Sequence, residues 1–214
     1  MISFIGSFSS YASSSSTIEQ TIISGALSTN VLNSNREAVD FPFASFSPKS
    51  YSYSCQKDSS ASTGIFGSDS QRLYVMNPAN ASNGFTLTIA ATAGASATWT
   101  DSTENHEYDF NDPTGSGCDD GVDSDSMGGQ LTIDPSVGTL TTDCGACSIS
   151  GVVKGDPASF IQGSNDSVTL LNASASSDDV WRGYLTGVQL LQTIPGEQLP
   201  GSYVISLTVT VTAS

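Results

Sequence analysis

The strongest constraint on the fold is an alternation of apolar and polar side chains with a period of two residues. It is clearest at residues 202–213, where every second residue from Tyr203 to Val211 is apolar and the intervening residues from Ser206 onward are Ser or Thr. Successive side chains of a strand point to opposite faces, so this pattern predicts a strand with one face on a core and the other in solvent. Helical spacing is nearly absent from the chain, which favours an all-β protein.

Shorter segments with the same alternation recur along the chain, separated by Gly, Pro, Asn and Asp residues that favour turns. They are residues 39–43, 51–55, 73–75, 85–89, 131–133, 168–170 and 188–190. Residues 18–32 have mixed spacing, and we expect strand there as well. About ten short strands joined by turns predict a β-sandwich, either a jelly roll or an immunoglobulin-like variant.

The first residues differ from the rest of the chain. Four Ser residues at 13–16 predict a linker, so residues 1–16 form an N-terminal arm and residues 17–214 a single domain. The apolar residues of the arm are Ile2, Phe4, Ile5 and Phe8. Two interpretations stay open: an extended strand that lacks a partner within the arm, or the remnant of a secretory signal that ends at Ser10 and Ala12.

The charge of the chain excludes several classes of partner. Its 214 residues include 21 Asp and Glu against 6 Lys and Arg, a formal net charge of -15. A chain without a basic cluster does not bind nucleic acid phosphates, and anionic membrane surfaces repel it. Membrane insertion is not expected either, because no apolar run approaches the roughly 18 residues that a spanning helix needs.

The four cysteines, Cys55, Cys118, Cys144 and Cys147, indicate disulfides and therefore a location outside the cytosol. The alternative is a zinc site, since residues 144–147 have the CxxC spacing. A zinc site would need a second CxxC or a pair of His residues, and the remaining Cys and His residues are scattered. We therefore expect disulfides.

Nine of the 21 acidic residues fall within residues 101–125, which show no strand alternation and are expected to form one long acidic loop. Calcium binds six to eight oxygen ligands, and closely spaced Asp residues can supply several of them. The candidate ligands are Asp109, Asp112, Asp119, Asp120, Asp123 and Asp125. Calcium is thus the expected ion, and the alternative is an acidic loop that is simply solvated.

Catalytic patterns are weak throughout. The chain has a single His, His106, without the second His of a zinc protease, and no nucleophile elbow or phosphate-binding Gly pattern is present. We therefore expect that the protein is not an enzyme. Trp99 and Trp181, with Tyr184, could stack against sugars, but tryptophans in a sandwich are more commonly buried, and we expect core packing.

Several segments resemble a group of secreted, β-rich surface proteins of ultra-small candidate-phylum bacteria, and the resemblance covers most of the chain from about residue 17 onward. These segments are residues 71–78, 85–91, 108–112, 129–135, 185–188, 192–195 and 201–203. The closing strand, which follows Pro200 and Gly201, is also similar to the last strand of WxL-type and pilin-like surface domains. The resemblance implies an extracellular, polymerising β-sandwich without enzymatic activity.

The resemblance also bears on the disulfides. The family pattern places a Cys before the Trp near position 181, whereas here Asp179 and Val180 precede it. Cys144 then takes the place of the missing Cys, and the implied pairs are Cys118–Cys147 and Cys55–Cys144.

The function expected from these features is that of a structural subunit of a cell-surface filament or coat. Copies of the chain would assemble by β-strand addition, with the apolar arm of one subunit pairing with an open sheet edge of the next. The alternative is a calcium-assisted adhesin that binds carbohydrate on a host cell or another glycan surface.

Overall fold

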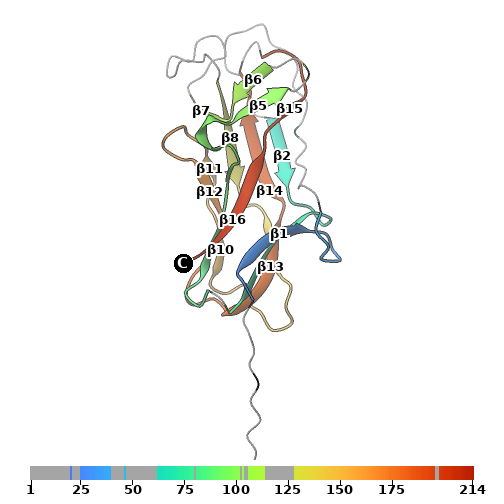
Figure 1. Cartoon of the computed structure of the whole chain (residues 1–214), viewed down its shortest axis with the longest axis vertical. Coiled ribbons are helices and arrows are strands. Elements are labelled where there is room, and N and C mark those ends of the chain that lie inside the picture. The colour runs from blue at the N-terminus through green and yellow to red at the C-terminus, as the bar shows by residue number, and fades with distance from the viewer. Residues whose placement is uncertain are drawn as a thin grey trace, which may run out of the picture.

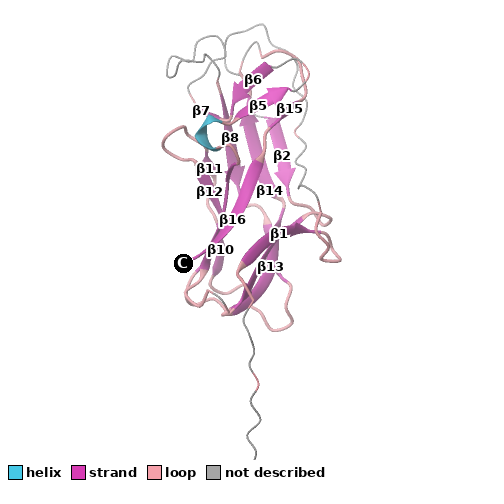
Figure 2. Ribbon diagram, in the orientation of Figure 1, coloured by secondary structure: helices cyan, strands magenta, loops and turns pink. Residues whose placement is uncertain are grey.

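A computed structural model of the chain describes residues 20, 25–39, 46, 62–79, 81–101, 103, 106–113, 128–195 and 198–214. Figures 1 and 2 show an elongated molecule built almost entirely of strands, with one short 3-10 helix, η1 (Gly94–Ser96). The strands are β1 (Ser28–Leu32), β2 (Ser62–Phe66), β3 (Arg72–Pro78), β4 (Phe85–Ala91), β5 (Thr98–Asp101), β6 (His106–Asp109), β7 (Asn111–Asp112), β8 (Gly129–Asp134), β9 (Thr139–Thr142), β10 (Val152–Lys154), β11 (Ala158–Ser159), β12 (Ser167–Ala173), β13 (Val180–Thr186), β14 (Val188–Thr193), β15 (Tyr203–Val204) and β16 (Leu207–Ala213). Within the described part of the chain, no helix is long and apolar enough to cross a membrane.

The first layer is organised around one long strand, residues 180–193, which consists of β13 and β14. On one side it pairs antiparallel with β3 and then β2, and on the other side with β9 and then β8. β2 with β3, and β8 with β9, thus form two long neighbours of the central strand. All three segments are interrupted at the same level. The central strand changes direction at Gly187, with φ of 72°, and its neighbours turn at 67–71 and 135–138. β1 extends this layer beyond β3, and β11 extends it beyond β8.

The second layer repeats this construction. β4 and β5 follow one another and pair antiparallel with β16 and β15 respectively. On the far side of β4 lie β12 and then β10, and on the far side of β5 lies β6. The two layers pack face to face because every second residue of β4, from Phe85 to Ala91, is buried, and β12 beside it also buries its core-facing residues.

One side of the sandwich is closed because the chain crosses between the layers there twice. β6 belongs to the second layer and is followed immediately by β7, which pairs with β8 of the first. β10 pairs with β12 of the second layer, and the next strand, β11, pairs with β8. The rings of Phe110 and Phe160, 5.0 Å apart, pack together at these crossings, and the amide of Leu131 donates to the Phe110 carbonyl oxygen.

The core runs the length of the sandwich and includes both tryptophans, which are buried as expected. The ring of Trp181 lies 5.5 Å from that of Phe85 across the two layers. Trp99 donates from its indole nitrogen to the side-chain oxygen of Gln192 at 2.9 Å, and the Gln192 amide nitrogen donates to the Thr193 carbonyl oxygen at 2.7 Å. The indole N–H of Trp99 and the side-chain amide of Gln192 therefore both have hydrogen-bond partners, as buried polar groups require.

The structure confirms the expected all-β sandwich but corrects several details. Residues 202–213 form two strands, β15 and β16, and of residues 18–32 only 28–32 are strand among those described. The expected strand-free loop at 101–125 is wrong in part, because β6 and β7 lie within it. The expected arm, residues 1–16, and the segment 51–55 lie outside the described residues.

Two glycines with positive φ offer a matched test of the packing between β4 and β12. Gly84 has φ of 103°, and a Cβ there would overlap the carbonyl oxygen of Ala173, whereas Gly94 has φ of 79° with nothing within 4 Å. Gly94→Ala should therefore cost only the left-handed backbone penalty, about 1–2 kcal/mol. Gly84→Ala should cost about 3 kcal/mol or more, because the strand end must also move. Urea unfolding of both variants checks this, and equal losses would contradict it.

Candidate functional site

The side of the sandwich opposite the chain crossings is open. Its two borders are β1, at the edge of the first layer, and β15 with β16, at the edge of the second. β16 lies beside β1 in the lower half of the molecule (Figure 1). We call this border region the open side.

The core-facing residues along the open side are only half-buried, although they pack against the core. They are Leu27, Val31, Tyr203, Ile205, Leu207, Val209 and Val211. By contrast, the core-facing residues Phe85, Leu87 and Ile89 of the neighbouring strand β4 are fully buried. The difference shows that the core is less well covered here than one strand further in.

β16 has the properties of an unprotected edge strand. It pairs with β4 through all seven of its residues, and no other strand of the described chain pairs with it. Natural sheets protect such edges with charged side chains, proline, bulges or very short strands. The sequence of β16, LTVTVTA, contains no charge and no proline, and its pairing has no register shift. The open side therefore offers a row of backbone groups that a further extended segment can pair with.

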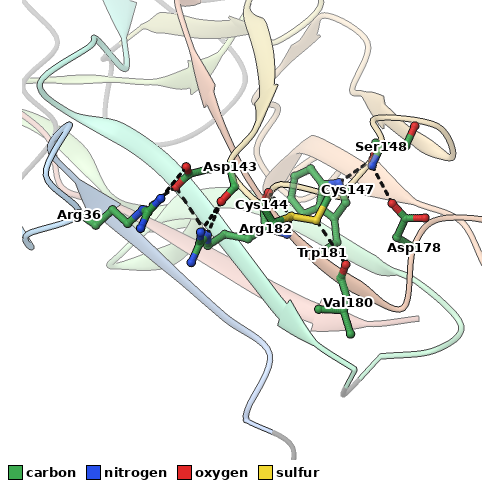
Figure 3. The surroundings of a disulfide bond; sticks show 9 residues. All are labelled: Arg36, Asp143, Cys144, Cys147, Ser148, Asp178, Val180, Trp181 and Arg182. Carbon is green, nitrogen blue, oxygen red and sulfur yellow. Dashed lines mark hydrogen bonds and ion pairs between the residues drawn. A yellow bond between two sulfur atoms is a disulfide. The ribbon is translucent and has the colours of Figure 1, made fainter.

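The edge of β13, unlike that of β16, is covered by other parts of the chain. β9 pairs with β13 only as far as Thr142, after which the Asp143 amide donates to the Arg182 carbonyl oxygen at 2.8 Å. Cys144 and Cys147 then form a disulfide-closed turn against the same edge (Figure 3). The Cys144 sulfur accepts from the Arg182 amide at 3.3 Å. The turn thus covers the edge that β9 leaves exposed.

This disulfide corrects the expected connectivity. Cys144 is bonded to Cys147, with a Cα–Cα distance of 5.4 Å, so the pairs Cys118–Cys147 and Cys55–Cys144 are wrong. The CxxC spacing that allowed a zinc site instead closes a local turn. Cys55 and Cys118 lie outside the described residues.

The expected calcium ligands are only partly described. Asp109 and Asp112 are buried, at 5% and 3% exposure, where β6 and β7 cross between the layers. Asp119, Asp120, Asp123 and Asp125 lie outside the described residues. Within the described ranges, no three His, Cys, Asp or Glu side chains are grouped so that they could hold a metal ion. Calcium binding stays a prediction, and so does the absence of catalytic activity.

Sequence reasoning missed an Asp that orders the start of β15. Asp101 at the end of β5 is buried, and it accepts hydrogen bonds from the amides of Thr103 at 2.8 Å and Ser202 at 3.1 Å. The hydrogen bond from Thr103 is the main cause of a pKa of Asp101 below its ordinary value, and the bond from Ser202 lowers this pKa further. The carboxylate therefore fixes the chain just before the edge strand. A lone Asp at a strand end gives no sequence signal for such a long-range partner.

A second Asp, Asp143, gathers two arginines on the outer face of the first layer. Arg36 donates to both of its carboxylate oxygens, at 2.8 and 2.9 Å, and Arg182 forms an ion pair with it at 3.5 Å (Figure 3). The hydroxyl of Tyr74 also donates to it, at 3.0 Å. The hydrogen bond from Arg36 is the main cause of a pKa of Asp143 below the ordinary value.

Comparison with known proteins gives no relative. No protein-family model, no curated protein and no solved structure matches the chain. The function must therefore be argued from the geometry.

The pKa of Asp143 predicts an acid-sensitive contribution to stability. Because the pKa is lowered in the folded state, the contribution is complete above about pH 4 and is lost as the pH falls through the folded-state pKa. Asp143→Asn should lower the unfolding free energy by about 1 kcal/mol at pH 7, since the pair is partly exposed. This difference from the parent should shrink below pH 4.

Urea unfolding between pH 2.5 and 7 measures this difference. Asp156→Asn, at an exposed position outside the Asp143 cluster, serves as the matched control. A deficit of Asp143→Asn that stayed constant down to pH 2.5 would contradict the assignment.

Proposed function

We propose that the chain is a structural subunit of an extracellular filament or coat, in which subunits are joined by β-strand addition. The observation that supports this is the unprotected edge of β16 on the open side. An added strand would pair with the free backbone groups of β16 and would cover its half-buried residues Leu207, Val209 and Val211. Completing the burial of such side chains contributes on the order of 1 kcal/mol each.

The proposed donor is the N-terminal arm, with its apolar residues Ile2, Phe4, Ile5 and Phe8. The arm has 16 residues and β16 has seven, so the arm is long enough to pair with all of β16 in an extended conformation. The arm precedes β1 in the sequence, and β1 is one border of the open side. A contact between the arm of one copy and the β16 edge of another joins two different surfaces and does not close on itself, which gives a filament rather than a dimer.

The proposal places the function outside the cell, where the disulfide between Cys144 and Cys147 is compatible with an oxidising environment. The partners are further copies of the chain. The adhesin alternative receives no specific support from the described residues, because both tryptophans, the residues best suited to stack on sugars, are buried. We therefore carry one proposal forward.

The donor is tested by removing it. Deletion of residues 1–12 should abolish filaments while leaving the sandwich folded, because the deleted residues precede every described strand. Negative-stain microscopy measures the filaments, and circular dichroism with a thermal melt checks the fold. Filaments of unchanged abundance in the deleted protein would exclude the arm as donor.

The acceptor is tested by two substitutions in β16 that introduce the same charge on opposite faces. Val209 faces the core on the open side and Thr210 faces solvent on the outer surface. Val209→Lys places an inward charge at the edge, a device that prevents strand addition, and should abolish filaments. Thr210→Lys should leave them unchanged.

Both variants are compared by the same microscopy and thermal melt. Filament loss in both variants, or in neither, would contradict β16 as the acceptor. A Val209→Lys protein that did not fold would be replaced by Val211→Lys, nearer the end of the strand.

A further inference from the structure

The outer face of the sheet β1-β3-β13-β9 carries all three arginines of the chain, Arg36, Arg72 and Arg182. Met76 and Arg182 are neighbours in one row of this face, and Tyr74 and Tyr184 in the next. We call the three arginines together with Tyr184 the arginine face; Tyr74 is buried, at 1% exposure, and supports this face from within. In a chain with a net charge of -15 and only 6 basic residues, this concentration of positive charge is distinctive.

The side chains of the arginine face are held in place by one another. The guanidinium of Arg72 lies 4.5 Å from the centre of the Tyr184 ring, which in turn lies 5.1 Å from the Tyr74 ring. Arg36 and Arg182 are fixed by Asp143 (Figure 3). Ordered side chains lose little conformational entropy on binding, so this face is preorganised for a partner.

The positive charge of the face is only partly neutralised within it. At its centre Asp143 pairs with both Arg36 and Arg182, so two guanidinium groups share one carboxylate. Asp69 approaches Arg72 at 3.7 Å from the margin, but its side chain is 96% exposed, and such surface pairs contribute little. Glu37, also at the margin, accepts a hydrogen bond from Asn33. The Nε atom of Arg72 is buried without a hydrogen-bond partner.

The outer face of the second layer is chemically different and serves as an internal comparison. Its central rows pair Thr88 with Thr210 and Thr86 with Thr212. This face has no arginine and no aromatic residue among the outward positions of β4 and β16. Arginine and tyrosine are among the residue types enriched at protein interfaces and at their energetic centres. The arginine face therefore has the composition of a docking surface, and the threonine face does not.

We propose that the arginine face binds the acidic segment 114–127 of a second copy of the chain. This inference rests on the proposed function and deepens it by naming a second contact between subunits. The segment contains Asp119, Asp120, Asp123 and Asp125 and no Lys or Arg, so its charge complements that of the face. Copies with a charge of -15 repel one another, and a contact of this kind offsets that repulsion locally.

The strands next to the two charged regions in the sequence lie toward opposite ends of the molecule, which agrees with a filament (Figure 1). β5, β6 and β7, which lead into the acidic segment, are at one end of the long axis, and β1 and β13 of the arginine face are near the other (Figure 1). A contact between opposite ends of two copies is head-to-tail and does not close. β1 is the first described strand after the arm in the sequence, so the strand contact and the charge contact would join the same two copies.

Peptide binding tests the proposal separately from filament formation. The probe is a fluorescent peptide of residues 114–127 with Ser in place of Cys118 and with blocked ends, titrated with the full chain below the concentration at which filaments form, in EDTA. Fluorescence anisotropy should show binding that weakens about tenfold between 50 and 500 mM NaCl, because salt screens exposed charges. The same peptide with Asn at its four Asp positions should not bind.

Two double variants assign the binding surface. Arg72→Gln with Arg182→Gln removes two positive charges from the arginine face and should weaken binding about tenfold. Thr208→Glu with Thr210→Glu changes the net charge by the same amount on the threonine face and should bind the peptide nearly as well as the parent. Thermal melts check that both double variants are folded. If the arginine double variant is unfolded, Arg36→Gln replaces it, because Arg36 is the most exposed of the three arginines.

Each result either supports or overturns the proposal. Equal weakening in the two double variants, binding of the Asn peptide, or no binding of the Asp peptide would overturn it. Peptide binding in a protein that forms no filaments would overturn the proposed function and leave the arginine face as an acidic-peptide site. Filaments without peptide binding would overturn the role of the arginine face and leave the proposed function standing.

Discussion

Backbone pairing along the central strand, residues 180–193, is the interaction on which the rest of the structure depends. Its two neighbours are each long segments of chain that follow it past the interruption at Gly187. Because all three segments are interrupted at one level, strand pairing stops and resumes there, and the Gly187 amide donates to the Gly67 carbonyl oxygen at the interruption. The second layer copies this arrangement with β4–β5 and β15–β16, and so the sandwich becomes long and narrow. A long sandwich has long borders, and the chain closes only one of them.

The strands that could be predicted from sequence are those in which alternation alone decides the burial. β4 and β16 are of this kind, because each has an uninterrupted run of apolar and hydroxyl residues. The central strand β13 escaped prediction, since Gly183 stands at a core-facing position and breaks the apolar row. The Trp181 ring lies over that position, so that a Cβ there would come within 2.6 Å of it. The position of Gly183 is buried because the Trp181 ring covers it. A pattern of apolar and polar residues does not show that one side chain fills the space at another position.

The acidic residues show a second limit of the sequence. Asp109 and Asp112 were expected as candidate calcium ligands in an acidic loop because acids cluster around them, yet both are buried in strands. They belong to β6 and β7, where the chain passes from one layer to the other. At such a crossing both faces of the strand meet protein, and alternation no longer separates inside from outside. The disulfide is a similar case: the pairing of Cys144 with Cys147 follows from a local turn against β13, whereas the expected pairs relied on distant cysteines.

The treatment of the two edges connects the fold with assembly. At β13 a disulfide-closed turn covers the backbone beyond the last residue paired with β9, so this edge is closed to a further strand. At β16 neither charge, proline nor bulge provides protection, although an uncharged edge with alternating valines is a hazard for any protein. A strongly acidic chain tolerates such an edge, because repulsion between copies opposes indiscriminate pairing. The proposed assembly through β16 would then need a contact that offsets the repulsion at one relative orientation. The ordered arginines around Asp143 lie on one face of the same sheet as β1 and could supply the positive charge for it. In the proposed filament, the arginine charges would select the relative orientation of two copies, and backbone pairing at β16 would stabilise the contact between them.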